Sequence, residues 1–163
     1  MSRLYIMCGV PGSGKTTFAK KWFPKTIKYV SRDEIRFSMI KTAEEYFSKE
    51  KEVFSTFVNK IQTFLDADYD VVADATHINK ASRFKLYSAL NMKNHVAAVV
   101  VLHTSLDTCL TRNDARQGTL SFVPHGAIRR MYSQFTFPSL EEELYLNCIY
   151  IVGSEGHASK IIR

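Results

Sequence analysis

The stretch GVPGSGKT occupies residues 9–16 and matches the pattern GxxxxGK[ST] at every position; Thr17 follows it. The apolar run LYIMCG at residues 4–9 leads into it, and a helical pattern from Lys15 to Phe23 follows. A buried strand, a glycine-rich loop and a helix in this order are the context that a phosphate-binding P-loop requires. That context argues against the alternative, a glycine-rich turn with an unrelated lysine.

The residue types of this loop suit the binding of a nucleoside triphosphate. Glycines at positions 9, 12 and 14 allow close approaches that a side chain would obstruct. Backbone N–H groups then hold the β-phosphate at the positive end of the helix. Lys15 supplies a cation for the β- and γ-phosphates, and the Thr16 hydroxyl supplies a ligand for Mg²⁺. The expected nucleotide-binding residues of the loop are Gly12, Ser13, Gly14, Lys15, Thr16 and Thr17.

Length and composition predict one compact α/β domain over residues 1–163. The chain is 45% hydrophobic and 23% charged, and its formal net charge of +6 favours anionic partners. Its three cysteines form no CxxC pair, which predicts buried free thiols in a reducing compartment. Apolar runs are too short to span a bilayer, so we expect a cytoplasmic protein without membrane contact.

Apolar runs of β type alternate with helical patterns, which predicts a three-layer fold with a parallel sheet between helices. In such a sheet, ligands bind beyond the carboxyl ends of the strands. The predicted strands are residues 4–9, 26–30, 70–74, 95–103 and 147–152, the last of them closing the fold. The predicted helices are residues 15–23, 33–40, 49–65, 80–91 and 105–117, with another after Pro124.

The segment SRDEIR at residues 31–36 follows the second predicted strand. Asp33 stands at a strand-to-helix junction, where a carboxylate can accept the proton of an attacking hydroxyl. Arg36 follows one helical turn later and can hold an anionic group of the acceptor. From the pattern alone, a helix-capping role for Asp33 and a surface charge at Arg36 explain these residues equally well.

A second carboxylate, Asp74, ends the buried strand in VVADATHINKASR, residues 71–83. It can support Mg²⁺ through water or position the acceptor, and an apolar strand end is a costly place for an idle charge. We expect Thr76, His77 and Asn79 to line the same rim. For His77, ordinary hydrogen bonding is favoured over catalysis.

Two arginines lie in LTRNDARQGTLSFVP, residues 110–124, where Gly118 and Pro124 mark a loop. Arg112 and Arg116 are four residues apart and would share one face of a helix. We expect a lid over about 112–124 in which Arg116 stabilises the transferring phosphate and Arg112 supports it. The alternative is a solvated basic helix end that complements the helix dipole.

With these residues in view, nearly the whole chain resembles the polynucleotide 5′-kinases, a family that includes a bacteriophage enzyme and the kinase domain of an animal DNA-repair enzyme. The stretches that carry the resemblance are GVPGSGKTTFAKKW, SRDEIR, VVADATHINKASR, RNDARQG and VPHGAIRRMYSQFTFPSLEEE. The resemblance implies that Asp33 is the general base, that Arg116 contacts the donor phosphates, and that Arg36 engages the acceptor's 3′-phosphate. Ser31 and the ATH turn at residues 75–77 depart from the family pattern on the acceptor side.

The leading hypothesis is therefore transfer of the ATP γ-phosphate, with Mg²⁺, to a 5′-hydroxyl end of DNA or RNA. In it, Asp33, Lys15 and Arg116 are catalytic, and Arg36, Asp74 and Thr76 bind the acceptor. The alternatives are a kinase of a nucleoside, modified base or other small hydroxylated acceptor, and a nucleotide-binding module without activity. The candidates for base stacking are Phe37, Tyr46, Phe47, Phe135 and Phe137.

Overall fold

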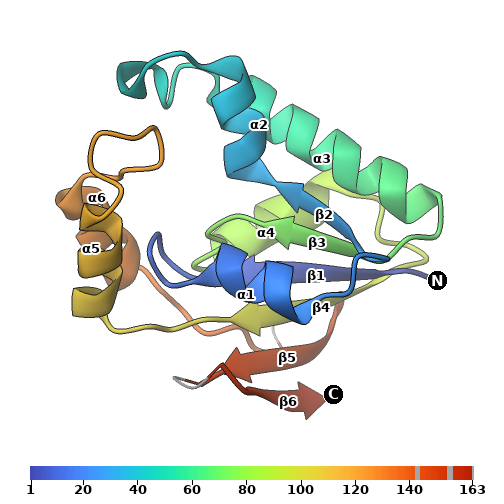
Figure 1. Cartoon of the computed structure of the whole chain (residues 1–163). Coiled ribbons are helices and arrows are strands. Elements are labelled where there is room, and N and C mark those ends of the chain that lie inside the picture. The colour runs from blue at the N-terminus through green and yellow to red at the C-terminus, as the bar shows by residue number, and fades with distance from the viewer. Residues whose placement is uncertain (142–143, 154–155, 163) are drawn as a thin grey trace.

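The computed structural model of the chain describes residues 1–141, 144–153 and 156–162. A six-stranded sheet runs through this part of the chain and is flanked by helices (Figure 1). Its strand order is β2-β3-β1-β4-β5-β6, with the first five strands parallel and β6 antiparallel to β5. The strands are β1 (Arg3–Cys8), β2 (Lys28–Ser31), β3 (Val71–Asp74), β4 (Val96–Val101), β5 (Leu146–Val152) and β6 (Ala158–Ile162).

The helices follow the sequence patterns closely. Each begins and ends within about three residues of its predicted bounds, and Ser105 caps α5 by accepting a hydrogen bond from Thr108 N. The helices are α1 (Lys15–Trp22), α2 (Arg32–Met39), α3 (Glu50–Asp66), α4 (Lys80–Ala89), α5 (Leu106–Asp114) and α6 (His125–Ser133), with a 3₁₀ turn, η1 (Ala43–Glu45).

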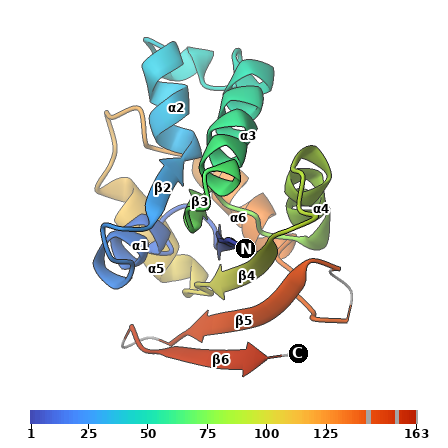
Figure 2. The same cartoon turned by 90° about the vertical axis from the view of Figure 1, so that its right-hand side faces the viewer.

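Helices cover both faces of the sheet (Figure 2). Successive residues of a strand point to opposite faces. On one face, Phe57 of α3 and Leu86 of α4 share a buried cluster with Leu4 of β1. On the other face, Ala19 of α1 packs in a cluster with Tyr5, the next residue of β1. These two apolar layers explain why the central strands consist of nearly continuous hydrophobic residues.

The carboxyl ends of the five parallel strands face α5 and α6 (Figure 1). A third buried cluster fixes these two helices there, joining Cys109 and Leu110 of α5 and Ile128 of α6 to Val10 and Ile78 of the loops after β1 and β3. The loops that follow the parallel strands therefore open towards the same edge of the sheet.

One element differs from the expectation. Residues 147–152 were predicted to form the last strand, but β6 follows and pairs antiparallel with β5, with Val152 opposite Ala158. An edge strand of five residues has a neighbour on one side only and needs no long apolar run, so its sequence signal is weak.

The cysteine pattern predicted buried free thiols, and this is confirmed: all three cysteines are buried and free. Within the described residues, none of the helices combines the length and the apolar character needed to traverse a lipid bilayer.

Candidate active site

The loop between β1 and α1 forms a tight cradle at the carboxyl edge of the sheet. Gly12 has a φ of 82°, and a Cβ on it would lie 2.3 Å from the carbonyl oxygen of Cys109 in α5. A side chain is therefore excluded here both by the backbone conformation and by the neighbouring helix. Gly14 caps α1 with a φ of 94°, so the backbone N–H groups of the first helical turn are left for a ligand.

Lys15 lies within this cradle, where its Nζ donates to the carbonyl oxygen of Val10 at 3.1 Å. Burial lowers the pKa of the Lys15 ammonium from its ordinary value, and the nearby carboxylates of Asp74 and Asp33 act in the opposite direction. Both carboxylates are therefore close enough to act on the cation that the sequence places at the β- and γ-phosphates.

Asp74 lies at the end of β3 and is directed at the first turn of α1. Its side chain is buried, and its Oδ2 accepts a hydrogen bond from the Thr16 hydroxyl at 2.6 Å and another from the hydroxyl of Tyr29. Burial and the Asp74 charge raise the pKa of the Tyr29 hydroxyl, which keeps Tyr29 a donor to this carboxylate.

Oxygen ligands of this kind fit Mg²⁺. Mg²⁺ usually keeps several waters and takes one or two protein oxygens together with substrate phosphates. The paired oxygens of Thr16 and Asp74 supply such a set beside the cradle. No cluster of three or more His, Cys, Asp or Glu side chains suited to a metal occurs among the described residues. Asp74 thus lies beside the phosphate cradle, in contact with Thr16.

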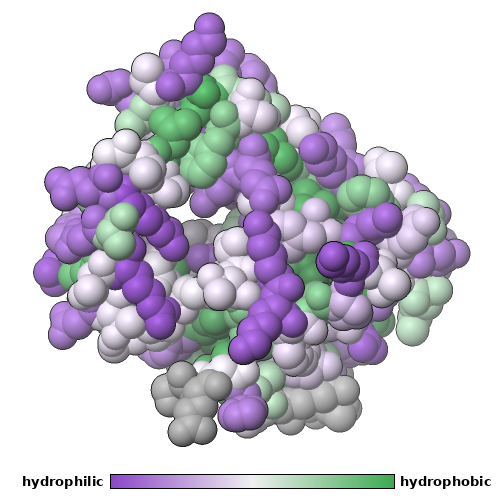
Figure 3. Space-filling model, in the orientation of Figure 1, coloured by the Kyte–Doolittle hydropathy of each residue, from purple (hydrophilic) through white to green (hydrophobic). Residues whose placement is uncertain are grey.

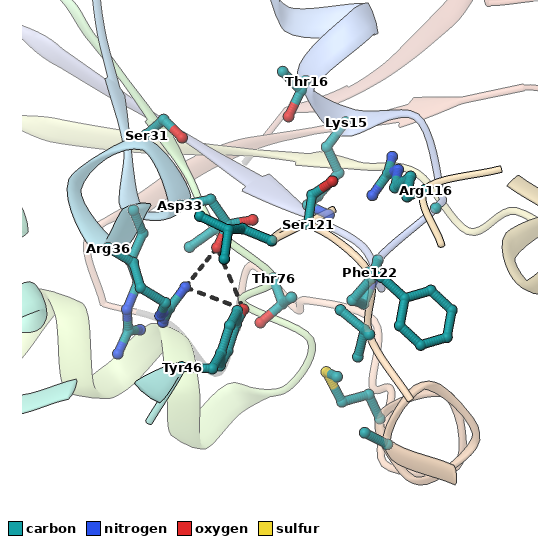
Figure 4. A pocket seen from close by; sticks show the side chains of 18 of the residues that line it. Lys15, Thr16, Ser31, Asp33, Arg36, Tyr46, Thr76, Arg116, Ser121 and Phe122 are labelled. Atoms are coloured by element: carbon teal, nitrogen blue, oxygen red, sulfur yellow. Dashed lines mark hydrogen bonds and ion pairs between the residues drawn. The ribbon is translucent and has the colours of Figure 1, made fainter. Parts of the chain in front are cut away.

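Asp33 lies in the first turn of α2 and faces the same cavity as Lys15 and Thr16 (Figure 4). The cap of α2 is Ser31, whose hydroxyl accepts from the backbone N–H of Glu34 at 3.2 Å. Asp33 is therefore not needed as the cap, and its side chain is 60% exposed. A carboxylate with solvent access, opposite the phosphate cradle, can accept a proton.

Asp33 belongs to a group of charged and polar side chains that we call the α2–α3 charge cluster: Arg32, Asp33, Arg36, Tyr46 and Glu50. Arg36 is at its centre and is only 6% exposed. Its Nη1 donates to Asp33 at 2.5 Å and to the Tyr46 hydroxyl at 3.1 Å, and its Nη2 donates to Glu50 at 2.8 Å. Glu50 also accepts a hydrogen bond from Arg32. Two arginines thus face two carboxylates.

Tyr46 closes the cluster on the side of the cavity. The Arg36 guanidinium lies over its ring, 4.3 Å from the centroid, and its hydroxyl is 3.4 Å from Asp33 Oδ1. Burial, together with the negative charge of Asp33, raises the pKa of the Tyr46 hydroxyl to about 12. The structure therefore places Arg36 against Asp33, where it orients the carboxylate and is itself largely covered.

The turn after β3 contains residues with different roles. Thr76 lines the cavity, and its carbonyl oxygen accepts from Gly9 N at 2.9 Å, which ties the turn to the phosphate cradle. His77 is buried, and its Nδ1 lies 3.0 Å from the carbonyl oxygen of Met7. Burial lowers the pKa of His77 to about 4, so the neutral ring donates to Met7. Asn79 caps α4 through Ser82 N; His77 and Asn79 therefore hold the turn in shape.

The two expected lid arginines lie in different places. Arg112 is in the last turn of α5, and its Nη1 donates to the carbonyl oxygen of Gly12 at 3.4 Å. α5 ends at Asp114, three residues before the predicted end, so Arg116 lies in the following turn and lines the cavity. The two arginines do not share a helix face, but both reach the nucleotide side of the site.

The loop after Arg116 is closed at its base by Asn113, which is fully buried. The Asn113 side chain donates to the carbonyl oxygen of Val123 at 2.8 Å and accepts from its N–H at 3.0 Å. This two-point contact fixes the ends of a loop whose residues Ser121 and Phe122 face the cavity (Figure 4).

Lys15, Asp33, Thr76, Arg116 and Phe122 line one cavity of about 650 Å³. The molecule is hollowed between the α2 side and the α5–α6 side, and hydrophilic side chains gather on the latter (Figure 3). Of the five aromatic residues expected to stack on bases, Tyr46 and Phe47 line the cavity, and Phe47 is 75% exposed. Phe135 packs partly buried against the core.

A parallel sheet with a P-loop after β1 and a carboxylate at the end of β3 defines a nucleotide-binding P-loop fold. The comparison with protein families agrees: a family model described as an AAA domain matches residues 4–138, and the chain belongs to this family.

Solved structures share the fold at low sequence identity. A chain of the Pnkp1/Rnl/Hen1 RNA repair complex is 24% identical with a TM-score of 0.68, and the match covers 82% of this chain. It covers 43% of that chain, so the protein spans less than half of its length. Kti12 of Chaetomium thermophilum, solved with ADP-AlF3, is 15% identical with a TM-score of 0.70, and the match covers 93% and 89% of the two chains.

A sugar kinase from a Janibacter species is also similar, at 16% identity and a TM-score of 0.64, over 93% of this chain and 84% of that one. These structures share a P-loop kinase-like fold with the chain; their names connect one with RNA repair and another with sugars.

Proposed function

We propose that the protein transfers the γ-phosphate of ATP to the 5′-hydroxyl end of a DNA or RNA strand. The observation that carries the proposal is that Asp33 faces Lys15 and Thr16 across one cavity, which continues past Asp33 between the α2–η1 side and α6. A donor phosphate and an acceptor hydroxyl can then occupy the same space, with a carboxylate beside the hydroxyl.

In this mechanism the cradle formed by Gly12 to Thr17 holds the triphosphate. Lys15 and Arg116 balance the charge that spreads over the γ-phosphate oxygens in the transition state. Thr16 and Asp74 would hold Mg²⁺ through their oxygens, and the ion would supply positive charge to the triphosphate. Arg112 braces the cradle through the carbonyl oxygen of Gly12.

Asp33 accepts the proton of the 5′-hydroxyl as its oxygen forms a bond to the γ-phosphorus. The bond between that phosphorus and the β–γ bridging oxygen breaks, and ADP leaves with the electron pair. Arg36 contributes to the acceptor side by orienting Asp33, and Thr76 lines the space where the terminal nucleoside lies. The loop from Arg116 to Val123 acts as the lid, with its ends held by Asn113.

Four observations support a polynucleotide acceptor. The motif resemblance covers nearly the whole chain, one of the similar structures belongs to an RNA repair complex, and the net charge is +6. Exposed Phe47 at the cavity offers a surface for base stacking, which tolerates any base because every base has a π-face.

A small hydroxylated acceptor is the second candidate. A sugar kinase and a gluconokinase from Sinorhizobium meliloti share the fold, with TM-scores of 0.64 and 0.54. In this reading the lid closes over the cavity, and Asp33 serves the hydroxyl of the small molecule instead.

The test presents γ-labelled ATP with a 5′-hydroxyl oligonucleotide, the corresponding nucleosides and gluconate in parallel reactions. We expect label in the oligonucleotide, dependent on Mg²⁺ and absent with the Lys15→Ala variant. Label found only in a small acceptor would replace the proposal with the second candidate. Transfer to no acceptor, with ATP still bound, would favour a nucleotide-binding module.

A further inference from the structure

Five cationic side chains line the cavity: Lys15, Arg32, Arg36, Arg116 and Arg130. Lys15 and Arg116 lie on the nucleotide side, where the donor phosphates would engage them. The remaining three lie where an acceptor strand would enter, and they differ in how much of their charge is available to it.

Arg32 and Arg36 are already neutralised within the α2–α3 charge cluster. Both bind Glu50, and Arg36 also binds Asp33. The side chain of Arg36 is 7% exposed. A substrate phosphate that bound Arg36 would have to displace one of these carboxylates and leave it beside another anion, which is electrostatically unfavourable.

Arg130 lies on the opposite wall, on α6, and is exposed. Its guanidinium has no hydrogen bond or ion pair with any other residue in the described part of the chain. Ala127 and Met131 line the cavity with it, and the spacing 127, 130, 131 defines one face of a helix. The preceding residue, Arg129, is also exposed but does not line the cavity.

A guanidinium in this state suits a phosphate group. Arginine offers a planar fork of N–H donors that binds two phosphate oxygens at once. Ile128 lies on α6 two residues before Arg130 and is fully buried in the cluster that α5 and α6 share. The backbone of Arg130 therefore has a fixed place relative to the cavity.

We infer that Arg130 binds the phosphate that follows the acceptor's 5′-terminal nucleoside, an inference that rests on the proposed function. The family resemblance implies this role for Arg36 instead. The acceptor therefore needs a phosphate at that position. A 5′-hydroxyl oligonucleotide and a nucleoside 3′-monophosphate both carry one, whereas a free nucleoside lacks it and is a poor substrate.

The experiment compares Arg130→Ala with the matched control Arg129→Ala, which removes an equal charge from the same helix. Each variant and the native protein receive a 5′-hydroxyl oligonucleotide, and the same oligonucleotide with a neutral methylphosphonate at its first linkage. Nucleoside and nucleoside 3′-monophosphate acceptors form a second series, which separates an internucleotide phosphate from a terminal one.

We expect Arg130→Ala to raise the acceptor KM by about tenfold or more, with the KM for ATP unchanged. For the native protein, the methylphosphonate oligonucleotide should have an acceptor KM higher by a similar factor than the unmodified one. For Arg130→Ala, the methylphosphonate should raise the acceptor KM little further, since the two changes remove the same contact. Arg130→Lys, which keeps the charge without the fork, should restore part of the affinity. Arg129→Ala should behave as the native protein.

Equal KM values for Arg130→Ala and Arg129→Ala on the oligonucleotide would overturn the inference. So would a further tenfold loss by Arg130→Ala on the methylphosphonate, because the two effects would then be independent. Both outcomes leave the polynucleotide kinase proposal standing. A native protein that labels no oligonucleotide at all would remove the proposed function and this inference together.

Discussion

Replacing Glu50 by glutamine removes the carboxylate that joins the two arginines of the α2–α3 charge cluster. Glu50 accepts from Arg32 through one oxygen and from Arg36 through the other, and its side chain is 35% exposed. Glutamine keeps one acceptor oxygen but turns an amide donor towards the second arginine. Losing one hydrogen bond to a charged group costs about 1.5–3 kcal/mol. Partial exposure places the expected loss near the middle, at about 2 kcal/mol, since solvent screens the pair.

A loss of about 2 kcal/mol corresponds to a fall in Tm of roughly 4–8 °C for a chain of this length. Urea denaturation, followed by circular dichroism, measures the free energy of unfolding directly. The control is Glu52→Gln, where an exposed side chain pairs with Lys49 at 3.7 Å and about 0.5 kcal/mol or less is expected.

The same substitution tests the link to Asp33. With Glu50 neutral, Arg36 is less firmly held, so kcat should fall while the KM for ATP stays constant. Stability and kcat indistinguishable between the Glu50 and Glu52 variants would refute the reasoning that this cluster positions the carboxylate.

Other changes to the site and its surroundings have distinct expected effects. Asp33→Asn should lower kcat by about 10²–10⁴-fold with nucleotide affinity retained, measured by steady-state kinetics and calorimetric titration; undiminished kcat would remove the general-base assignment. Arg116→Ala should lower kcat at least about tenfold without changing acceptor KM, and a pure KM effect would count against its transition-state role. His77 has a pKa lowered by burial from 6.5 to about 4, so the unfolded chain takes up its proton first. The free energy of unfolding should therefore fall by up to about 3 kcal/mol as pH drops from about 6.5 to about 4; in urea titrations, His77→Asn, which tolerates the local φ of 41°, should flatten that slope.

Much of the fold was predictable because local signals agreed with one another. The P-loop stands between a strand and a helix, and β4 is buried along nearly its whole length, as its unbroken apolar run predicted. The buried residues of α3, among them Phe57 and Ile61, recur at helical spacing, which made this helix recognisable. β6 escaped prediction because an edge strand is defined by its pairing partner more than by its own composition.

The candidate site was predictable to the extent that it follows strands. Asp33 and Thr76 follow strands within two residues and Asp74 ends one, and parallel topology brings them to one edge. Tyr29 was missed, although strand pairing explains it: Ser31 lies opposite Asp74, and Tyr29, two residues earlier, shares their face. Side chains alternate between the two faces of a strand, so the sequence places Tyr29 and Asp74 on one face only when the pairing register of β2 and β3 is known.

The partners of Arg36 could not be read from the sequence. Tyr46 and Glu50 lie 10 and 14 residues further on, beyond the end of α2, and no periodic pattern links them. The contact between Asn113 and Val123 is of the same kind, since it depends on how a loop returns to its helix. Such contacts decide whether a charged side chain is available to bind a substrate, whereas the sequence shows only that the side chain is present.

The central claim is that a 5′-terminal oxygen receives the γ-phosphate of ATP. It is tested most directly by locating the transferred phosphorus: an oligonucleotide incubated with γ-labelled ATP is digested to nucleotides, and the labelled product is identified. We predict that all of the label is recovered in the 5′-monophosphate of the first nucleotide, and that an oligonucleotide already phosphorylated at that end takes up none. Label at any other position, or an oligonucleotide left unlabelled beside a phosphorylated small molecule, would contradict the claim.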